Sequence, residues 1–199
     1  MDNQIIISIS REFGSGGRVI ATELARRFQL PLYDHNILEQ VAQEVGVHPE
    51  TLKRYDESPK NVLISRTIKG FSNSPEENVA RMQFNYLRRM AANGDSFLVL
   101  GRCGEEVLKD FPNLISIFIL SDISFKKARI MERDGISSDE ALELLAKMDR
   151  QRKYYHNQYC RGKWGDSRNY DLCINSARLG IEGTIDYLTQ YIRSRVDLM

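Results

Sequence analysis

The stretch that decides the fold is Ile5-Ile6-Ile7-Ser8-Ile9-Ser10-Arg11-Glu12-Phe13-Gly14-Ser15-Gly16-Gly17-Arg18, near the start of the chain. Its first five residues are mostly β-branched and apolar, which is typical of a short strand buried in a parallel sheet. Just after the stretch, Ile20, Leu24 and Phe28 recur at helical spacing. The stretch therefore predicts a strand, a glycine-rich turn and a helix, in that order.

The turn is a candidate anion site. Three glycines within four residues allow successive backbone amides to point inward together, and the positive end of the following helix adds its field. A tight turn with no ligand is the alternative, but the position after the first strand favours phosphate. The candidate phosphate-binding residues are Arg11, Gly14, Ser15, Gly16, Gly17 and Arg18.

Neither of two common phosphate-loop motifs fits literally. A dinucleotide-binding GxGxxG motif that starts at Gly14 requires glycine where the chain has Val19. A Walker A motif, GxxxxGK[ST], with Gly17 as its second glycine has Arg18 and Val19 where lysine and serine or threonine belong. Because the third glycine is missing, an NAD-dependent oxidoreductase is the weaker interpretation.

Strand-like and helix-like segments alternate through the rest of the chain. Further strands are expected at residues 29–33, 96–100, 114–120 and 170–175, and a last helix at residues 181–195. This alternation predicts an α/β fold whose parallel sheet is covered by helices on both faces. With 199 residues, of which 42% are hydrophobic, the chain suits a single domain over residues 1–199.

Residues 35–93 look mostly helical and contain no convincing strand. Ser74-Pro75-Glu76-Glu77 combines an N-cap, a proline for the first turn and a capping-box glutamate, so it predicts a helix to about Ala92. Asn93-Gly94 is expected to end that helix. The polar residues 56–74 are expected to form a mobile loop.

Two predicted helices carry arginines on shared faces. Arg129 and Arg133 are four residues apart on one of them. A second capping box, Ser137-Ser138-Asp139-Glu140, opens the next helix, on which Arg150 and Arg152 cluster. A solvated basic face is the alternative to a ligand-binding one.

The composition sets limits on function. Lysine plus arginine total 28 and aspartate plus glutamate 27, which argues against a nucleic-acid binder driven by bulk charge. Cys103, Cys160 and Cys173 are far apart in sequence, so neither a zinc site nor a disulfide framework is expected. The three histidines are isolated, and no chemistry is expected of them. Without a basic leader or a long apolar run, the chain is expected to be soluble, cytoplasmic and free of membrane partners.

The run from Ile7 to Gly17 resembles the cytidylate kinase-like family, a divergent branch of the nucleoside monophosphate kinases. The likeness spans essentially the whole chain, with further matches at Leu32-Tyr33-Asp34, Leu100-Gly101-Arg102-Cys103, residues 125–152 and Tyr170-Asp171-Leu172-Cys173-Ile174-Asn175. It implies a P-loop kinase with five parallel strands. It also implies a helical arm that binds the acceptor nucleotide, at about residues 35–93, and an arginine-rich lid over ATP, at about residues 134–165.

The resemblance also implies ATP and Mg²⁺ as cofactors, and roles for particular residues. Phosphoryl transfer requires positive charge around the transferred group. The candidate catalytic residues are Arg18, as the nearest replacement for the lysine, and the lid arginines Arg129, Arg133 and Arg150. Asp34 and Arg102 follow strands at the carboxyl edge, where α/β sheets bind ligands, and are the candidate acceptor-binding residues. No protein residue is assigned to a metal, and Asp34 is alternatively a helix N-cap.

The chain departs from true cytidylate kinases at two points. Those enzymes have a lysine in the phosphate loop, and they have Gly-Arg-Asp where this chain has Gly101-Arg102-Cys103. The expected function is ATP-dependent transfer to a small acceptor, a nucleoside monophosphate such as CMP by resemblance. The alternatives are a kinase of another small metabolite and a non-catalytic nucleotide sensor that kept the loop but lost the lysine.

Overall fold

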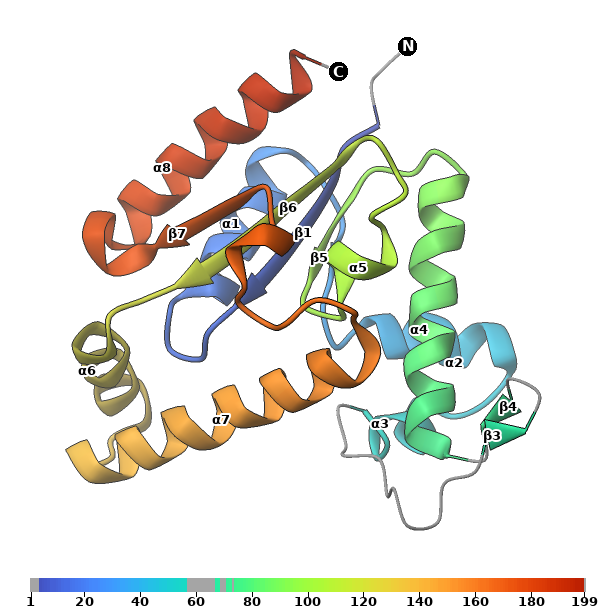
Figure 1. The fold of residues 1–199 in the computed structure, drawn as a ribbon, viewed down its shortest axis with the longest axis horizontal. Helices are drawn as coiled ribbons and strands as arrows, with labels where there is room; N and C mark the ends of the chain where they lie inside the picture. Colours follow the sequence, from blue (N-terminus) through green and yellow to red (C-terminus); the bar gives the residue numbers. More distant parts are fainter. Residues whose placement is uncertain (1–3, 57–66, 69–70, 73, 199) are drawn as a thin grey trace.

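The computed structural model describes residues 4–56, 67–68, 71–72 and 74–198. Its centre is a five-stranded, all-parallel sheet in the order β2-β5-β1-β6-β7 (Figure 1). The strands are β1 (Ile6–Arg11), β2 (Leu32–Tyr33), β5 (Phe97–Leu100), β6 (Leu114–Leu120) and β7 (Leu172–Asn175). The parallel α/β sheet predicted from the alternating pattern is confirmed.

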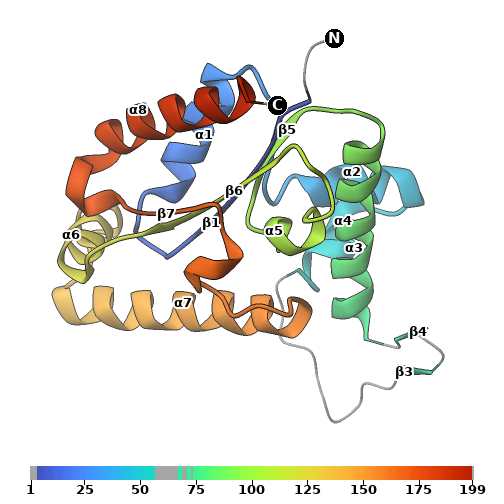
Figure 2. The ribbon, with the colours of Figure 1, turned by 45° about the horizontal axis from the view of Figure 1, so that its top comes forward.

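Helices cover both faces of this sheet. Figure 2 shows α1 and α8 on one side and α5 and α7 on the other. The helices are α1 (Gly17–Arg27), α2 (Ile37–Val45), α3 (Pro49–Lys53), α4 (Pro75–Ala92), α5 (Gly104–Val107), α6 (Ile123–Asp134), α7 (Ser138–Tyr159) and α8 (Ser176–Val196).

Residues 35–93 are mainly helical, as expected, but they also contain a small antiparallel pair. This pair consists of β3 (Thr67–Ile68) and β4 (Phe71–Ser72), so the expectation of no strand in this segment is wrong. Two residues per strand are too few to produce an alternation that can be read from the sequence. Most of the loop expected at residues 56–74 lies outside the described residues.

The central strand is buried on both of its faces. Ile7 and Ile9 belong to the hydrophobic core beneath α1 and α8, whereas Ile6 belongs to the core shared with α2, α4 and α5. All three side chains are fully buried. The continuous apolar run at the start of the chain therefore reflects a strand covered on two sides.

The strand order places a crevice at the carboxyl end of β1. The chain leaves β1 for β2 on one side, beyond β5, and later fills the other side with β6 and β7. In open α/β sheets, ligands bind outside the carboxyl ends of the strands at such a switch point. The glycine turn begins at this place.

Helix ends follow the capping residues found in the sequence. Ser74 caps α4, which ends at Ala92. At the start of α7, the Ser137 hydroxyl accepts from the Glu140 amide, while the Glu140 carboxylate accepts from the Ser137 amide at 2.9 Å. Gly180 has a φ of 68° inside α8, so the regular part of that helix begins at Ile181, as predicted.

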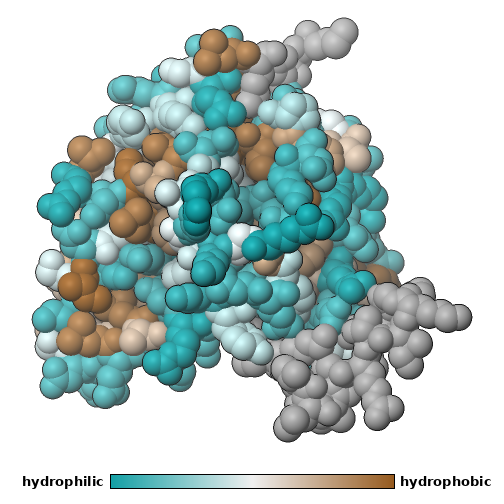
Figure 3. Space-filling model, viewed as in Figure 1, coloured by the Kyte–Doolittle hydropathy of each residue, from teal (hydrophilic) through white to brown (hydrophobic). Residues whose placement is uncertain are grey.

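The face of the molecule drawn in Figure 3 is mostly polar. In Figure 3, hydrophobic residues gather toward the left, around α6 and the start of α8, while hydrophilic residues cover much of the remaining face. Among the helices within the described residues, none combines the length and apolar character needed to cross a membrane.

The close approach of α5 to the sheet gives a test of the fold. A Cβ on Gly104 would lie 2.5 Å from Ser8 Oγ and 2.8 Å from Val99 Cγ1, so Gly104→Ala should overpack this contact. We expect the free energy of unfolding in urea to fall by about 1–3 kcal/mol. Ser8→Ala, which removes the nearest atom, should restore part of the loss in the double variant. Equal stability of Gly104→Ala and the wild type would contradict this packing.

Candidate active site

The loop between β1 and α1 offers backbone donors without acceptors. Gly14 and Gly16 have φ values of 78° and 81°, a left-handed backbone that glycine adopts without strain. Within the described part of the chain, nothing accepts a hydrogen bond from the amides of Gly14, Gly16, Gly17, Arg18 or Val19. Gly17 is buried and Gly14 and Gly16 are half-buried, so their amides require an acceptor, which a phosphate group would supply.

The α6–α7 hairpin anchors the same loop. The Glu12 carboxylate accepts from Lys126 Nζ at 2.9 Å and from the Ser121 amide at 3.0 Å. The Phe13 amide donates to Asp149 Oδ1 at 2.6 Å, and Lys126 also reaches Asp149 at 3.3 Å. Burial raises the pKa of Asp149 despite these partners. The loop is therefore held by one helix pair and does not rest on the sheet alone.

Three arginines of this hairpin surround the loop. The guanidinium groups of Arg133 and Arg152 lie 5.2 Å and 5.4 Å from the centre of the Phe13 ring. Arg152 also donates to the Arg11 carbonyl at 3.2 Å. Arg129 Nη2 lies 3.7 Å from the position that a Cβ on Gly16 would take.

Of the arginines predicted for the lid, Arg129 and Arg133 thus lie at the loop. Arg150 is exposed and lines a separate hollow with Lys153 and Tyr154, on another face of α7. Arg152 lies at the loop in place of Arg150, because residue 152 shares a helix face with Asp149, which holds the loop. The helical spacing from Asp149 shows which of the two arginines faces the loop. The sequence alone, however, does not show that Asp149 itself faces the loop.

At the end of β2, the Asp34 carboxylate is buried between two arginines. Its oxygens lie 3.8 Å from Arg11 Nη2 and 3.6 Å from Arg18 Nε. Asp34 is not the cap of α2, since Asn36 occupies that position and accepts from the Asp34 amide at 2.7 Å. Asp34 Oδ1 accepts no hydrogen bond from the described residues, which leaves it available to a ligand.

The turn after β5 carries Arg102 in an uncommon conformation. Gly101, Arg102 and Cys103 have φ values of 79°, 59° and 54°. Left-handed non-glycine residues are strained by about 1–3 kcal/mol each, and they cluster at functional sites. The turn directs Arg102 into the protein, where its guanidinium is fully buried against Asp56.

Asp56 and His35 complete this arrangement and were not identified from the sequence. Both nitrogen ends of the Arg102 guanidinium contact the Asp56 carboxylate, one of them at 2.9 Å, and Arg102 Nη2 lies 2.8 Å from His35 Nδ1. Burial by itself raises the pKa of Asp56, but the His35 hydrogen bond and the Arg102 charge together hold it well below the usual range. Asp56 and His35 both belong to the helical segment after β2, and no sequence pattern indicates that this segment lies close to Arg102.

These elements meet around a small cavity of about 30 Å³. Its lining includes Arg11, Arg102 and Arg152, together with His156. Burial lowers the pKa of His156, but hydrogen bonds with Cys160 and with Glu105, whose carboxylate lies 2.6 Å away, raise it to about 10. The expectation that His156 is isolated is wrong, because the fold brings Glu105 to it across 51 residues. The cavity is therefore lined by four positive groups.

The five-stranded parallel sheet with helices on both faces is the fold of the P-loop kinases. A shikimate kinase structure from Bacteroides thetaiotaomicron shares the fold, with a TM-score of 0.53 at 12% identity over 95% of this chain and 98% of its own.

The chain belongs to the cytidylate kinase-like family, whose profile matches residues 6–178. It is 26% identical over 183 residues to the cytidylate kinase of Pyrococcus horikoshii, covering 91% of this chain and 84% of that protein. It also resembles the crystal structure of an uncharacterized protein from Eubacterium ventriosum, with a TM-score of 0.76 and 40% identity over 96% and 99% of the two chains. Family and fold support phosphoryl transfer as the general class of reaction.

The Arg102–Asp56 pair gives a pH-dependent test. Asp56→Asn takes away the negative charge that balances the buried Arg102 guanidinium, so it should lower the free energy of unfolding at pH 7 by about 3–5 kcal/mol. The folded-state pKa of Asp56 is depressed, so the stabilisation is present above the unfolded value of about 3.9 and is lost as the pH falls below it. The difference in the free energy of unfolding between wild type and Asp56→Asn should therefore become smaller as the pH falls. Urea denaturation at several pH values measures this difference.

The exposed Asp110 provides the matched control. Asp110→Asn should follow the wild-type stability at each pH. A constant difference between wild type and Asp56→Asn from pH 7 to pH 3 would show that the pair does not carry this stabilisation.

Proposed function

We propose that this protein is an ATP- and Mg²⁺-dependent kinase that phosphorylates a nucleoside monophosphate, with CMP as the leading acceptor. The observation that carries the proposal is the junction of two features at one sheet edge. The loop from Gly14 to Val19 has backbone amides that find no acceptor among the described residues, and it adjoins the cavity lined by Arg11, Arg102 and Arg152. Two phosphorylated substrates placed on these features would meet at the carboxyl end of β1.

The loop residues fit the phosphates of a nucleoside triphosphate. A Cβ on Gly17 would approach Arg11 Cβ to 2.7 Å, so glycine is needed there for the loop to pass. The backbone amides of Gly14, Gly16 and Gly17 would hold the β- and γ-phosphates together with the Arg11 side chain, and Ser15 would shape the loop between the glycines. Arg18, whose side chain is 74% exposed and reaches toward Asp34, would supply the charge that lysine provides in a Walker A loop.

The acidic residue that fits Mg²⁺ best is Asp34. Mg²⁺ is usually held by one or two carboxylates together with substrate phosphates, and Asp34 Oδ1 is buried beside the loop without a hydrogen bond. When bound, Mg²⁺ would balance the negative charge of the phosphates and favour their in-line approach.

Arg102 would hold the acceptor phosphate, with Asp34 beside it. A larger hollow of about 420 Å³, lined by Arg81, Phe84, Arg88 and Tyr159, lies between α4 and the C-terminal end of α7. Its size and mixture of aromatic and cationic side chains suit the nucleoside part of an acceptor. This supports residues 35–93 as the acceptor-binding arm and residues 134–165 as the lid.

From the lid, Arg129 and Arg133 would add positive charge at the transferred phosphoryl group. For α7, the geometry favours Arg152 over Arg150, because Arg152 contacts the loop and lines the cavity. A phosphate that binds Arg102 would compete with Asp56 for its guanidinium, since bidentate pairing uses the same nitrogen atoms.

The direct test is to incubate the protein with Mg·ATP and each common nucleoside monophosphate, and to follow ADP release. We expect turnover that depends on the acceptor and is fastest with CMP. Faster turnover with another small hydroxylated metabolite would reassign the acceptor. ATP binding without turnover on any acceptor would favour a nucleotide sensor, in which the cations remain paired with Asp34, Asp56 and Glu105.

The role of Arg18 has its own test. Arg18→Ala should lower kcat by about a hundredfold, equivalent to about 2.7 kcal/mol of transition-state stabilisation. ATP affinity should change less, because the backbone amides of the loop remain. The matched control is Arg26→Ala, which removes an exposed arginine from the other end of α1. Equal turnover of Arg18→Ala and Arg26→Ala would assign the catalytic charge to the lid.

A further inference from the structure

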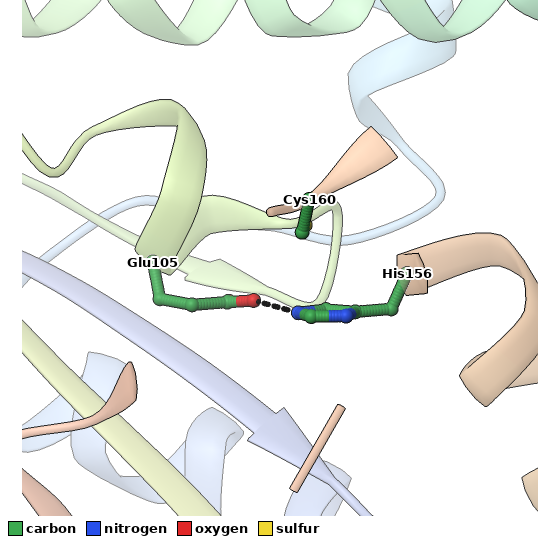
Figure 4. Close-up of side chains that lie close together, drawn as sticks. All are labelled: Glu105, His156 and Cys160. Carbon is green, nitrogen blue, oxygen red and sulfur yellow. Dashed lines mark hydrogen bonds and ion pairs between the residues drawn. The ribbon is translucent and has the colours of Figure 1, made fainter. Parts of the chain in front are cut away.

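We propose that Cys103, Glu105, His156 and Cys160 form a binding site for a structural Zn²⁺ ion. The ligand atoms of Glu105, His156 and Cys160 lie within 4.8 Å of one another. Figure 4 shows Glu105 and His156 pointing toward each other, with Cys160 beside them. The proposal concerns a different ion from the Mg²⁺ of the kinase reaction and does not depend on that function.

The fourth ligand is Cys103. Cys103 lines the same cavity as His156 and lies two residues before Glu105, so its thiol is the fourth ligand-type group beside the cluster. Cys103, Glu105 and His156 are buried. Two sulfurs, one imidazole nitrogen and one carboxylate oxygen are a ligand set that suits tetrahedral Zn²⁺.

The ligands come as two short chelating pairs. Cys103 and Glu105 are separated by one residue in the turn that leads from β5 into α5. His156 and Cys160 are four residues apart at the end of α7, so they lie on the same side of that helix. Cys103 is held in a left-handed conformation at the start of α5.

Outer contacts already orient two of the ligands. Ser10 Oγ donates to Glu105 Oε2 at 3.0 Å, while Oε1 faces His156. The other imidazole nitrogen, His156 Nδ1, lies 3.2 Å from Asn157 Oδ1. If Nδ1 carries the proton, Nε2 is the ligand atom, and this is the usual outer-shell arrangement around a metal-binding histidine.

Zinc would take the place of the direct contact between Glu105 Oε1 and His156 Nε2, which lie 2.6 Å apart. Binding would displace the Nε2 proton of His156 and the thiol protons of Cys103 and Cys160, and these protons would pass to solvent. Two thiolates and one carboxylate would more than balance the ion, which permits a site close to Arg102. The ion would fasten the end of α7 to the turn that carries Arg102.

The test uses the full-length protein, stripped with a chelator, kept under a thiol reductant and free of nucleotide. It is titrated with Zn²⁺ and, separately, with Co²⁺. We expect one ion per chain, a higher Tm with Zn²⁺, and for Co²⁺ the strong visible absorption of a tetrahedral site with a thiolate charge-transfer band. Cys160→Ser should weaken Zn²⁺ affinity by at least about tenfold and reduce that band.

The third cysteine gives the matched control. Cys173 lies in β7, apart from the cluster, so Cys173→Ser should bind Zn²⁺ and Co²⁺ like the wild type. His156→Asn is the second ligand variant, and circular dichroism checks that each variant is folded. Three outcomes would overturn the proposal: no stoichiometric uptake by the reduced wild type, uptake unchanged in folded Cys160→Ser, or a weak octahedral Co²⁺ spectrum without the charge-transfer band. None of these outcomes bears on kinase turnover.

Discussion

The constraint on which this site depends is the pairing of positive charge at the carboxyl edge of the sheet. Arg11, Arg102 and His156 line one cavity, and each faces a carboxylate, from Asp34, Asp56 and Glu105 respectively. Buried charges of one sign would otherwise repel each other and resist burial. The carboxylates hold the cations in place, and an arriving phosphate would find them already oriented.

The candidate site also requires a glycine loop whose backbone amides remain accessible to a ligand while the residues beside the loop are held in place. Glycines at left-handed positions shape the loop, and Glu12 and Phe13 tie it to Lys126 and Asp149 on the α6–α7 hairpin. Because the same hairpin carries Arg129, Arg133 and Arg152, the glycine loop and the hairpin form one packed unit. A shift of the hairpin would therefore change the position of the loop.

Much of the fold and part of the candidate site could be predicted from the local sequence. The apolar run of β1, the turn glycines and the capping boxes act over a few residues, so their patterns indicate strand, loop and helix limits directly. The positions of Arg18 beside the loop and of Arg102 at the end of β5 follow from the same reasoning, since both adjoin recognisable strands. The family resemblance rests on these same segments.

Only the tertiary structure decided which distant side chains meet. His156 and Glu105 are 51 residues apart, and Asp56 and Arg102 are 46 apart, with no shared periodicity to connect them. Arg152 rather than Arg150 faces the loop because Asp149 fixes the rotation of α7. The pattern of apolar residues in each element reflects how that element is buried, and this is a local property. Which distant side chains come into contact depends on the packing of several elements at once. The sequence by itself therefore determined the sheet, the glycine-rich loop after β1 and the family, and the packed fold decided the charge pairs and the Cys–Glu–His cluster.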